Sequence, residues 1–336
     1  MNEKIKIRYF VLILFLGLSF SAYAQMPDLK DLQKGVANFS EDLAKSLPFN
    51  SSMGLNWSDA YIGKFFPSLP PHFGVGMSFG FTTMKLASIE TLAGYLGYKI
   101  PFDMTRMPLP AYTVEGRMGG ILLPFDVGFK FGYLPPVGLW GSDTNMDYLL
   151  VGGDIRYVVL DKAILPKISV GMGINYLKGG IGAKVGKSME LTYYDGGSQT
   201  IALEKPELIL KWDTVSLDFK TQVSKSFLII TPYLGLGMSY AWSSAGYSVD
   251  TKVSHNGNPI EQPDIDTIKA YLRQAGLEDM DVDSSGISSI IKNSAFSFRL
   301  FGGLSLNLTA FRVDLTGLYS FRDSNIGASL GFRFQL

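Results

Sequence analysis

The sequence predicts an all-β protein: a closed antiparallel transmembrane β-barrel of about ten strands with an N-terminal helical segment. Three observations carry this prediction. Ten segments alternate strictly between apolar residues and small or polar ones, which is the period of a strand with two different faces. The apolar set is rich in aromatic side chains, and each segment approaches the roughly 9–11 residues with which a tilted strand crosses a bilayer. The links between segments alternate between short and long.

Residues 1–24 have the pattern of a cleavable signal peptide. Lys4, Lys6 and Arg8 give a positive start, residues 10–20 are apolar, and Ala22-Tyr23-Ala24 ends the segment with an A-x-A cleavage pattern. The apolar run is shorter than the roughly 20 residues of a membrane-spanning helix. We therefore expect export from the cytoplasm and a mature chain that begins at Gln25.

Residues 25–71 form an N-terminal helical or plug segment. Apolar residues recur at helical spacing through 26–50, at Leu29, Leu32, Val36, Phe39, Leu43 and Leu47. Two placements fit this pattern: a helix against the membrane or the base of the barrel, which we favour, and a plug inside the lumen. The stretch 54–63 either extends the plug or adds a strand, and we prefer the first because an eleventh strand would break the even count.

Residues 72–336 form the predicted barrel with long outer loops. Its strands are expected at 73–81, 112–118, 125–132, 149–157, 168–176, 215–222, 234–242, 296–305, 311–319 and 326–336, and a hairpin within 187–212 would raise the count to twelve. A soluble β-sandwich also alternates, but its water-facing side would more often carry Lys, Glu and Thr than this mixture of Gly, Ser and opposite charges. An apolar band around a polar interior favours the barrel.

Link lengths support the barrel independently. The links near 121–124, 161–166, 224–226 and 307–309 are short, whereas those near 83–109, 134–146, 179–213 and 245–293 are long, and the last link, 323–325, is short again. Barrels in the bacterial outer membrane combine short periplasmic turns with longer outer loops. The chain ends in a strand whose Phe332, Phe334 and Leu336 alternate up to the last residue.

These features resemble bacterial outer-membrane β-barrel proteins across 72–336 and the signal peptide. The resemblance implies a bacterial outer-membrane location, contact with outer-membrane lipid, and recognition of Phe332, Phe334 and Leu336 by the barrel-assembly machinery. The family usually ends in Phe, and this chain ends in Leu336. The architecture is also similar to FadL-like channels for hydrophobic compounds, although the chain is shorter and lacks their Asn-Pro-Ala motif.

The inward face of the predicted barrel is charged. Its lumen-lining candidates are Glu115, Arg117, Asp126, Lys130, Asp154, Arg156, Asp218, Lys220, Arg299, Arg312, Asp314 and Arg333, together with Arg322. We expect these charges to pair with one another, because unpaired charge in a confined interior is costly. The alternative is a narrow polar pore, and the many inward glycines favour some cavity. On this assignment Val127→Arg is disruptive and Gly128→Ser is mild.

Two predicted outer loops carry apolar residues at helical spacing, at Leu86, Ile89 and Leu92 and at Ile268 and Leu272. Large apolar side chains above a membrane need a partner. Packing of the loops on each other is the favoured explanation, and a landing site for a hydrophobic small molecule is the alternative.

Composition excludes several functions. The 30 basic and 30 acidic residues balance, and loss of Lys4, Lys6, Arg8 and Glu3 with the signal would leave a net charge of −2, which argues against nucleic-acid binding. Cysteine is absent and only two histidines occur, so we expect no catalytic thiol, no metal site and no cofactor. Asp279, Asp281 and Asp283 alternate as in a calcium loop but lack the EF-hand spacing.

We expect a non-enzymatic, porin-like transport protein of the cell surface. The favoured function is a narrow or plugged channel for small or amphipathic solutes. The alternative is a sealed barrel that acts as a surface anchor or adhesin through its outer loops.

Overall fold

The computed structural model describes residues 29–62, 72–85, 106–120, 124–138, 144–162, 164–184, 189–194, 198–203, 207–250, 253–255, 258–259, 281–283 and 286–336. The signal peptide and the loop residues Leu86, Ile89, Leu92, Ile268 and Leu272 lie outside these ranges. No helix in the described part of the chain is long and apolar enough to cross a membrane.

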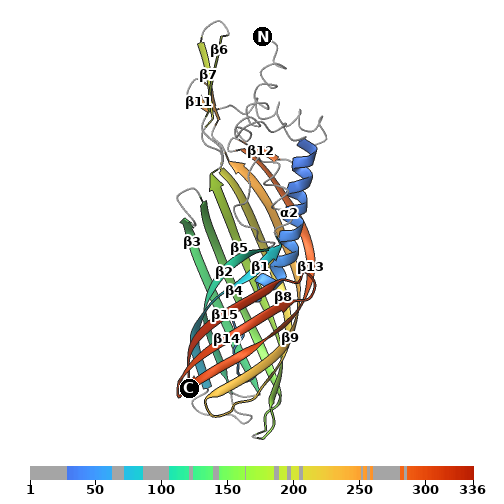
Figure 1. Cartoon of the computed structure of the whole chain (residues 1–336), viewed down its shortest axis with the longest axis vertical. Helices are drawn as coiled ribbons and strands as arrows, with labels where there is room; N and C mark the ends of the chain where they lie inside the picture. The colour runs from blue at the N-terminus through green and yellow to red at the C-terminus, as the bar shows by residue number, and fades with distance from the viewer. Residues whose placement is uncertain are drawn as a thin grey trace.

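Ten long strands close into an antiparallel barrel (Figure 1). They are β1 (His72–Lys85), β2 (Arg106–Gly119), β3 (Phe125–Gly138), β4 (Thr144–Leu160), β5 (Lys167–Lys184), β8 (Glu207–Ser224), β9 (Ile230–Asp250), β13 (Gly286–Leu308), β14 (Phe311–Ser320) and β15 (Ile326–Gln335). Each pairs with its neighbours in this order. β1 pairs with β15, and β9 pairs with β13, which leaves the sheet without a free edge.

The barrel is apolar outside, as the alternation predicts. Val127 and Phe129 of β3 are 57% and 56% exposed, whereas Asp126 and Lys130 on the same strand are buried. The other barrel strands likewise expose apolar side chains and bury polar ones, the reverse of the usual arrangement in a water-soluble protein. Because large exposed apolar side chains on this scale are stable only against lipid, this band marks the membrane-facing surface.

The strands continue beyond the lipid band at the end where the long links lie. On β5, β8 and β13 the outward positions closer to that end than Tyr176, Val215 and Phe296 include exposed charged residues, namely Lys178, Lys211, Asp213 and Lys292. Several links are therefore shorter than predicted. The link expected at 134–146 spans 139–143, because β3 runs to Gly138 and β4 starts at Thr144.

Two ends of the barrel can be told apart. The turns 120–124, 161–166, 225–229 and 309–310 lie at one end, together with the start of β1 and the C-terminus. The last residues of β1, β5 and β9 and the first residues of β2, β8 and β13 lie at the other. We name these the inner, periplasmic end and the outer end, because short turns face the periplasm in such barrels.

The hairpin expected within 187–212 does form, but it does not enlarge the barrel. β6 (Met189–Tyr194) pairs with β7 (Ser198–Leu203), and both belong to a separate four-stranded sheet with β10 (Val253–His255) and β11 (Asn258–Pro259). This small sheet projects from the outer end (Figure 1). The barrel itself has ten strands, and the short β12 (Asp281–Asp283) only extends the edge of β13.

The N-terminal segment lies inside the barrel. Helix α2 (Leu29–Asn50) occupies the outer half of the interior, and residues 51–62 continue as irregular chain through the inner half. We call residues 29–62 the lumenal segment. The favoured expectation, a helix against the membrane or the base of the barrel, is therefore wrong. Residues 54–62 form no strand, and their backbone groups bond to side chains of the wall.

Candidate functional site

The outer half of the lumen is apolar. Phe39, Leu43 and Leu47 form one face of α2 and are at most 1% exposed. They belong to a single buried cluster with inward side chains of the wall, which include Met84, Leu109, Tyr148, Leu150, Leu177, Trp212 and Tyr247. The opposite face of the helix carries the exposed Glu41, whose carboxylate pairs with Lys45 at 2.8 Å. The amphipathic pattern of the helix thus fits its place inside the barrel, because its apolar face packs on the wall and its polar face is exposed to solvent.

The inner half of the lumen is polar and binds the peptide backbone of residues 51–59. Lys130 Nζ donates to the carbonyls of Ser51 and Met53 at 2.8 and 2.5 Å. Further wall donors reach successive carbonyls: Lys220 to Leu55, Tyr233 to Asn56, Gln222 to Trp57 and Arg156 to Asp59. These carbonyls thereby gain partners without secondary structure, which is what a non-helical chain needs in an interior with little water.

Trp57 is the main side-chain anchor of the lumenal segment. Its Nε1–H donates to Glu115 Oε2 at 2.6 Å, and its ring lies beneath the guanidinium groups of Arg333 and Arg117, 4.8 and 5.7 Å from the ring centroid. Cation–π contacts of this kind strengthen when the groups are desolvated. The ring occupies the space above Gly74, where a Cβ would lie 2.8 Å from Trp57. The inward glycine therefore makes room for the segment instead of leaving an open cavity.

The charges of the wall form buried ion-pair networks. Asp126 lies between Arg117 and Arg156, and Asp154 lies between Arg117 and Lys220, with closest nitrogen–oxygen distances of 2.5 to 2.7 Å. A second pair joins Asp218 to Arg299 at 2.7 Å. Pairing on this scale offsets the cost of removing each charge from water.

The lumenal segment supplies the acid that the wall lacks. The predicted lumen set has more bases than acids, and Asp59 enters it from the N-terminal segment. Its Oδ2 atom pairs with Arg312 at 2.7 Å and with Arg333 at 2.9 Å, while Arg333 also pairs with Asp314 at 2.6 Å. Barrel and segment are therefore electrostatically matched.

Polar groups inside and apolar groups outside, on a sheet without edges, fit only a lipid environment. The chain is an outer-membrane β-barrel protein. The twelve residues predicted to line the lumen all face the interior of the barrel. Ten of them are at most 8% exposed. Arg322 does not join them, because it lies exposed in the turn after β14.

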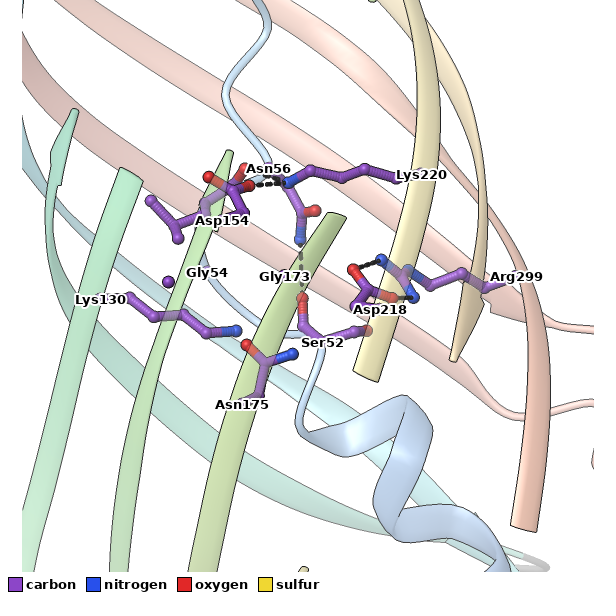
Figure 2. A pocket seen from close by; sticks show the side chains of 12 residues that line it. Ser52, Gly54, Asn56, Lys130, Asp154, Gly173, Asn175, Asp218, Lys220 and Arg299 are labelled. Atoms are coloured by element: carbon purple, nitrogen blue, oxygen red, sulfur yellow. Dashed lines mark hydrogen bonds and ion pairs between the residues drawn. The ribbon is translucent and has the colours of Figure 1, made fainter. Parts of the chain in front are cut away.

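A small polar cavity remains between the barrel and residues 52–56. Figure 2 shows Lys130, Asn175, the Asp154–Lys220 pair and the Asp218–Arg299 pair around Ser52 and Asn56. Its volume is about 10 Å³, close to the smallest cavity that holds one water molecule, so it is no pocket for a larger ligand. A solute could pass this level only if the lumenal segment moved.

The wall has one weak seam, between β2 and β3. These two strands pair only from Val114↔Phe131 to Gly119↔Asp126. Residues 106–113 of β2 and 132–138 of β3, which continue toward the outer end, do not pair with each other. Pro108, Pro110, Pro135 and Pro136 lie in the unpaired parts, where they remove amide donors that would otherwise need partners. At the end of the ladder Tyr148 of β4 closes the gap: its hydroxyl accepts from the Tyr112 amide at 2.6 Å and donates to the Tyr112 carbonyl.

Sequence reasoning did not find this seam or the role of Tyr148. The prolines were a usable signal, because proline is confined to edge positions of sheets. Within the described ranges, no group of three or more His, Cys, Asp or Glu side chains could hold a metal ion.

Comparisons with known proteins find distant structural likenesses only. No protein-family model matches the chain, and no curated protein matches it. Among solved structures it is similar to the translocator domain of the autotransporter NalP from Neisseria meningitidis, with 8% identity, a TM-score of 0.34, and coverage of 91% of this chain and 98% of that one. A Pseudomonas aeruginosa FadL homologue has 7% identity, a TM-score of 0.26, and coverage of 83% and 97%.

A third similar structure is an enzyme by its name: the outer membrane protease OmpT from Escherichia coli, with 10% identity, a TM-score of 0.31, and coverage of 83% and 100%. At these identities the likeness concerns the barrel fold alone.

Proposed function

We propose that this outer-membrane barrel is a plugged channel for small or amphipathic solutes, and that the lumenal segment is its plug. The observation that carries the proposal is the separateness of the two parts. The ten strands close their own ladder through β1–β15 and β9–β13, and residues 29–62 contribute no strand to it. The plug can therefore move without opening the sheet.

The two halves of the lumen favour solutes with a polar and an apolar part. The outer half presents Tyr148, Trp212 and Tyr247 to its interior, and the inner half presents the charged networks. The unpaired outer parts of β2 and β3 lie beside the apolar half. A hydrophobic small molecule released there would meet the membrane surface instead of the ion pairs, whose disturbance is costly.

Single-channel recording in planar bilayers tests the proposal. We expect rare, small conductance steps from the full mature chain, and large, persistent steps when residues 26–71 are removed. A chain with Trp57→Ala, which loses the Glu115 bond and both cation–π contacts, should open more often than the intact chain. Absence of conductance in all three forms, with the barrels shown to be folded, would contradict a channel.

The alternative is a sealed surface anchor or adhesin. The dense bonding of the plug and the small sheet β6–β7–β10–β11, which projects outward, favour it. An anchor predicts no conductance with or without the plug, and loss of host or matrix binding when 189–203 is removed.

Three further expectations stay with this proposal. We propose that the signal peptide is removed after Ala24, that the assembly machinery recognises the last strand, and that the protein is not an enzyme. Phe332 and Leu336 support the second, since both are exposed on the lipid side at the inner end of β15.

A further inference from the structure

We infer that the amino end of the lumenal segment faces the cell exterior, so that the mature chain runs through its own barrel from outside to inside before β1 begins. The inference rests on chain direction inside the barrel and does not depend on whether the barrel conducts.

Contacts along β8 give the direction of residues 51–62. This strand runs from Glu207 at the outer end to Ser224 at the inner end, next to the short turn 225–229. Ser51 Oγ lies 2.8 Å from Ser216 Oγ, the Leu55 carbonyl accepts from Lys220, and the Ala60 amide donates to Ser224. Both sequences advance together toward the inner end, so the segment descends through the lumen.

The last contact lies at the periplasmic end. The Ile62 amide donates to Asp126 Oδ2 at 3.2 Å, and Asp126 is the second residue of β3, directly after the short turn 120–124. The start of β1 is at the same end, where Gly119 pairs with His72. The segment therefore reaches the periplasmic rim where its chain must continue into the barrel.

Helix α2 lies at the opposite end. Phe39 and Leu43 belong to a cluster with Met84, Trp212 and Tyr247, which sit near the outer ends of β1, β8 and β9. Figure 1 shows the blue helix rising to the end that carries β12, opposite the C-terminus. With 22 residues the helix is about 33 Å long, so helix and inner segment together span the lumen.

Two consequences follow. A retained signal peptide would hold the amino end on the other side of the envelope, so this arrangement requires cleavage. A ligand that arrives from outside would also meet α2 first, before the pinned residues 51–62.

Single-cysteine labelling on intact cells tests the inference, because the natural chain has no cysteine and each variant carries one thiol. The probe is a small sulfonated maleimide that does not cross the outer membrane. The test site is Asn38→Cys, an exposed position of α2. Matched controls are Arg322→Cys in the outer turn, Lys162→Cys in an inner turn, and the buried Ser46→Cys.

We expect Asn38→Cys to be labelled in intact cells to the same extent as Arg322→Cys. Lys162→Cys should be labelled only after the outer membrane is permeabilised, and Ser46→Cys in neither case. Labelling of Asn38→Cys only after permeabilisation, together with Lys162→Cys, would overturn the inference. No labelling of Asn38→Cys in either state would overturn it as well, because the helix would then not present this face to the outer solution. Conductance is not part of this readout, so failure here is distinct from failure of the channel.

Discussion

Asp126 accepts hydrogen bonds from two guanidinium groups and one backbone amide while its side chain is fully buried. Asp126→Asn would leave Arg117 and Arg156 short of a negative partner inside the barrel. We expect a loss of about 3–5 kcal/mol in unfolding free energy, measured by thermal unfolding in detergent micelles. The control Glu41→Gln breaks only the exposed pair with Lys45 on α2 and should cost less than about 0.5 kcal/mol. Equal effects would mean that the Asp126 network is hydrated.

Val127 is the neighbour of Asp126 on the opposite face, and 57% of it is exposed to the lipid side. Val127→Arg places a charge among acyl chains and should cost about 2–4 kcal/mol in the same unfolding assay. The control is Leu228→Arg, which changes a fully exposed apolar residue of an inner turn and should leave stability unchanged. A harmless Val127→Arg would show that this face does not contact lipid.

Gly128 shows where residue-level reasoning from sequence fails. Gly128→Ser looked mild because small residues fill the inward face. In the structure an added Cβ would lie 2.6 Å from both Arg117 Nη2 and Asp154 Oδ1. A side chain at position 128 would therefore clash with the ion pair that these two residues form. The pair joins β2 to β4 across β3, and such a contact depends on the stagger between strands, which alternation alone does not define.

At the scale of elements, Tyr148 substitutes for a missing stretch of ladder. Its hydroxyl satisfies the amide and carbonyl of Tyr112 where β2 and β3 stop pairing. Tyr148→Phe leaves both backbone groups without this partner, and we expect a loss of about 1–3 kcal/mol in unfolding free energy. Faster amide hydrogen exchange at 106–113 should accompany it. Tyr133→Phe, on the lipid side of β3, is the matched control and should change neither value.

The strands and the helix could be predicted because apolar residues recur every second position in the strands and about every 3.6 positions in the helix. The placement of the helix was not. The inward faces change from charged to apolar toward the outer end, as in Asp154, Leu150 and Tyr148 on β4, and this change is what creates a binding surface for α2. The alternation by itself separates inward from outward residues and does not reveal this change along the strand.

At the scale of the whole molecule, the barrel and its N-terminal segment are complementary parts of one chain. Apolar contacts hold α2 in the outer half, and hydrogen bonds from Lys130, Lys220 and Gln222 hold the backbone in the inner half. An apolar ligand can replace the apolar contacts of α2 at little cost in free energy, because such contacts are not directional. Breaking the hydrogen bonds of buried charged groups costs much more. We therefore expect α2 to respond to outer ligands and residues 51–62 to form the seal.

A reversible lock on the seal tests this account most directly. The Ser51 and Ser216 hydroxyl oxygens are 2.8 Å apart, and the chain has no other cysteine, so the double variant Ser51→Cys, Ser216→Cys should form one disulfide between plug and wall. We predict that the oxidised form shows no conductance in planar bilayers and that reductant restores the steps of the unmodified chain. Failure of the disulfide to form, or equal conductance before and after reduction, would contradict a lumen closed by a movable N-terminal plug.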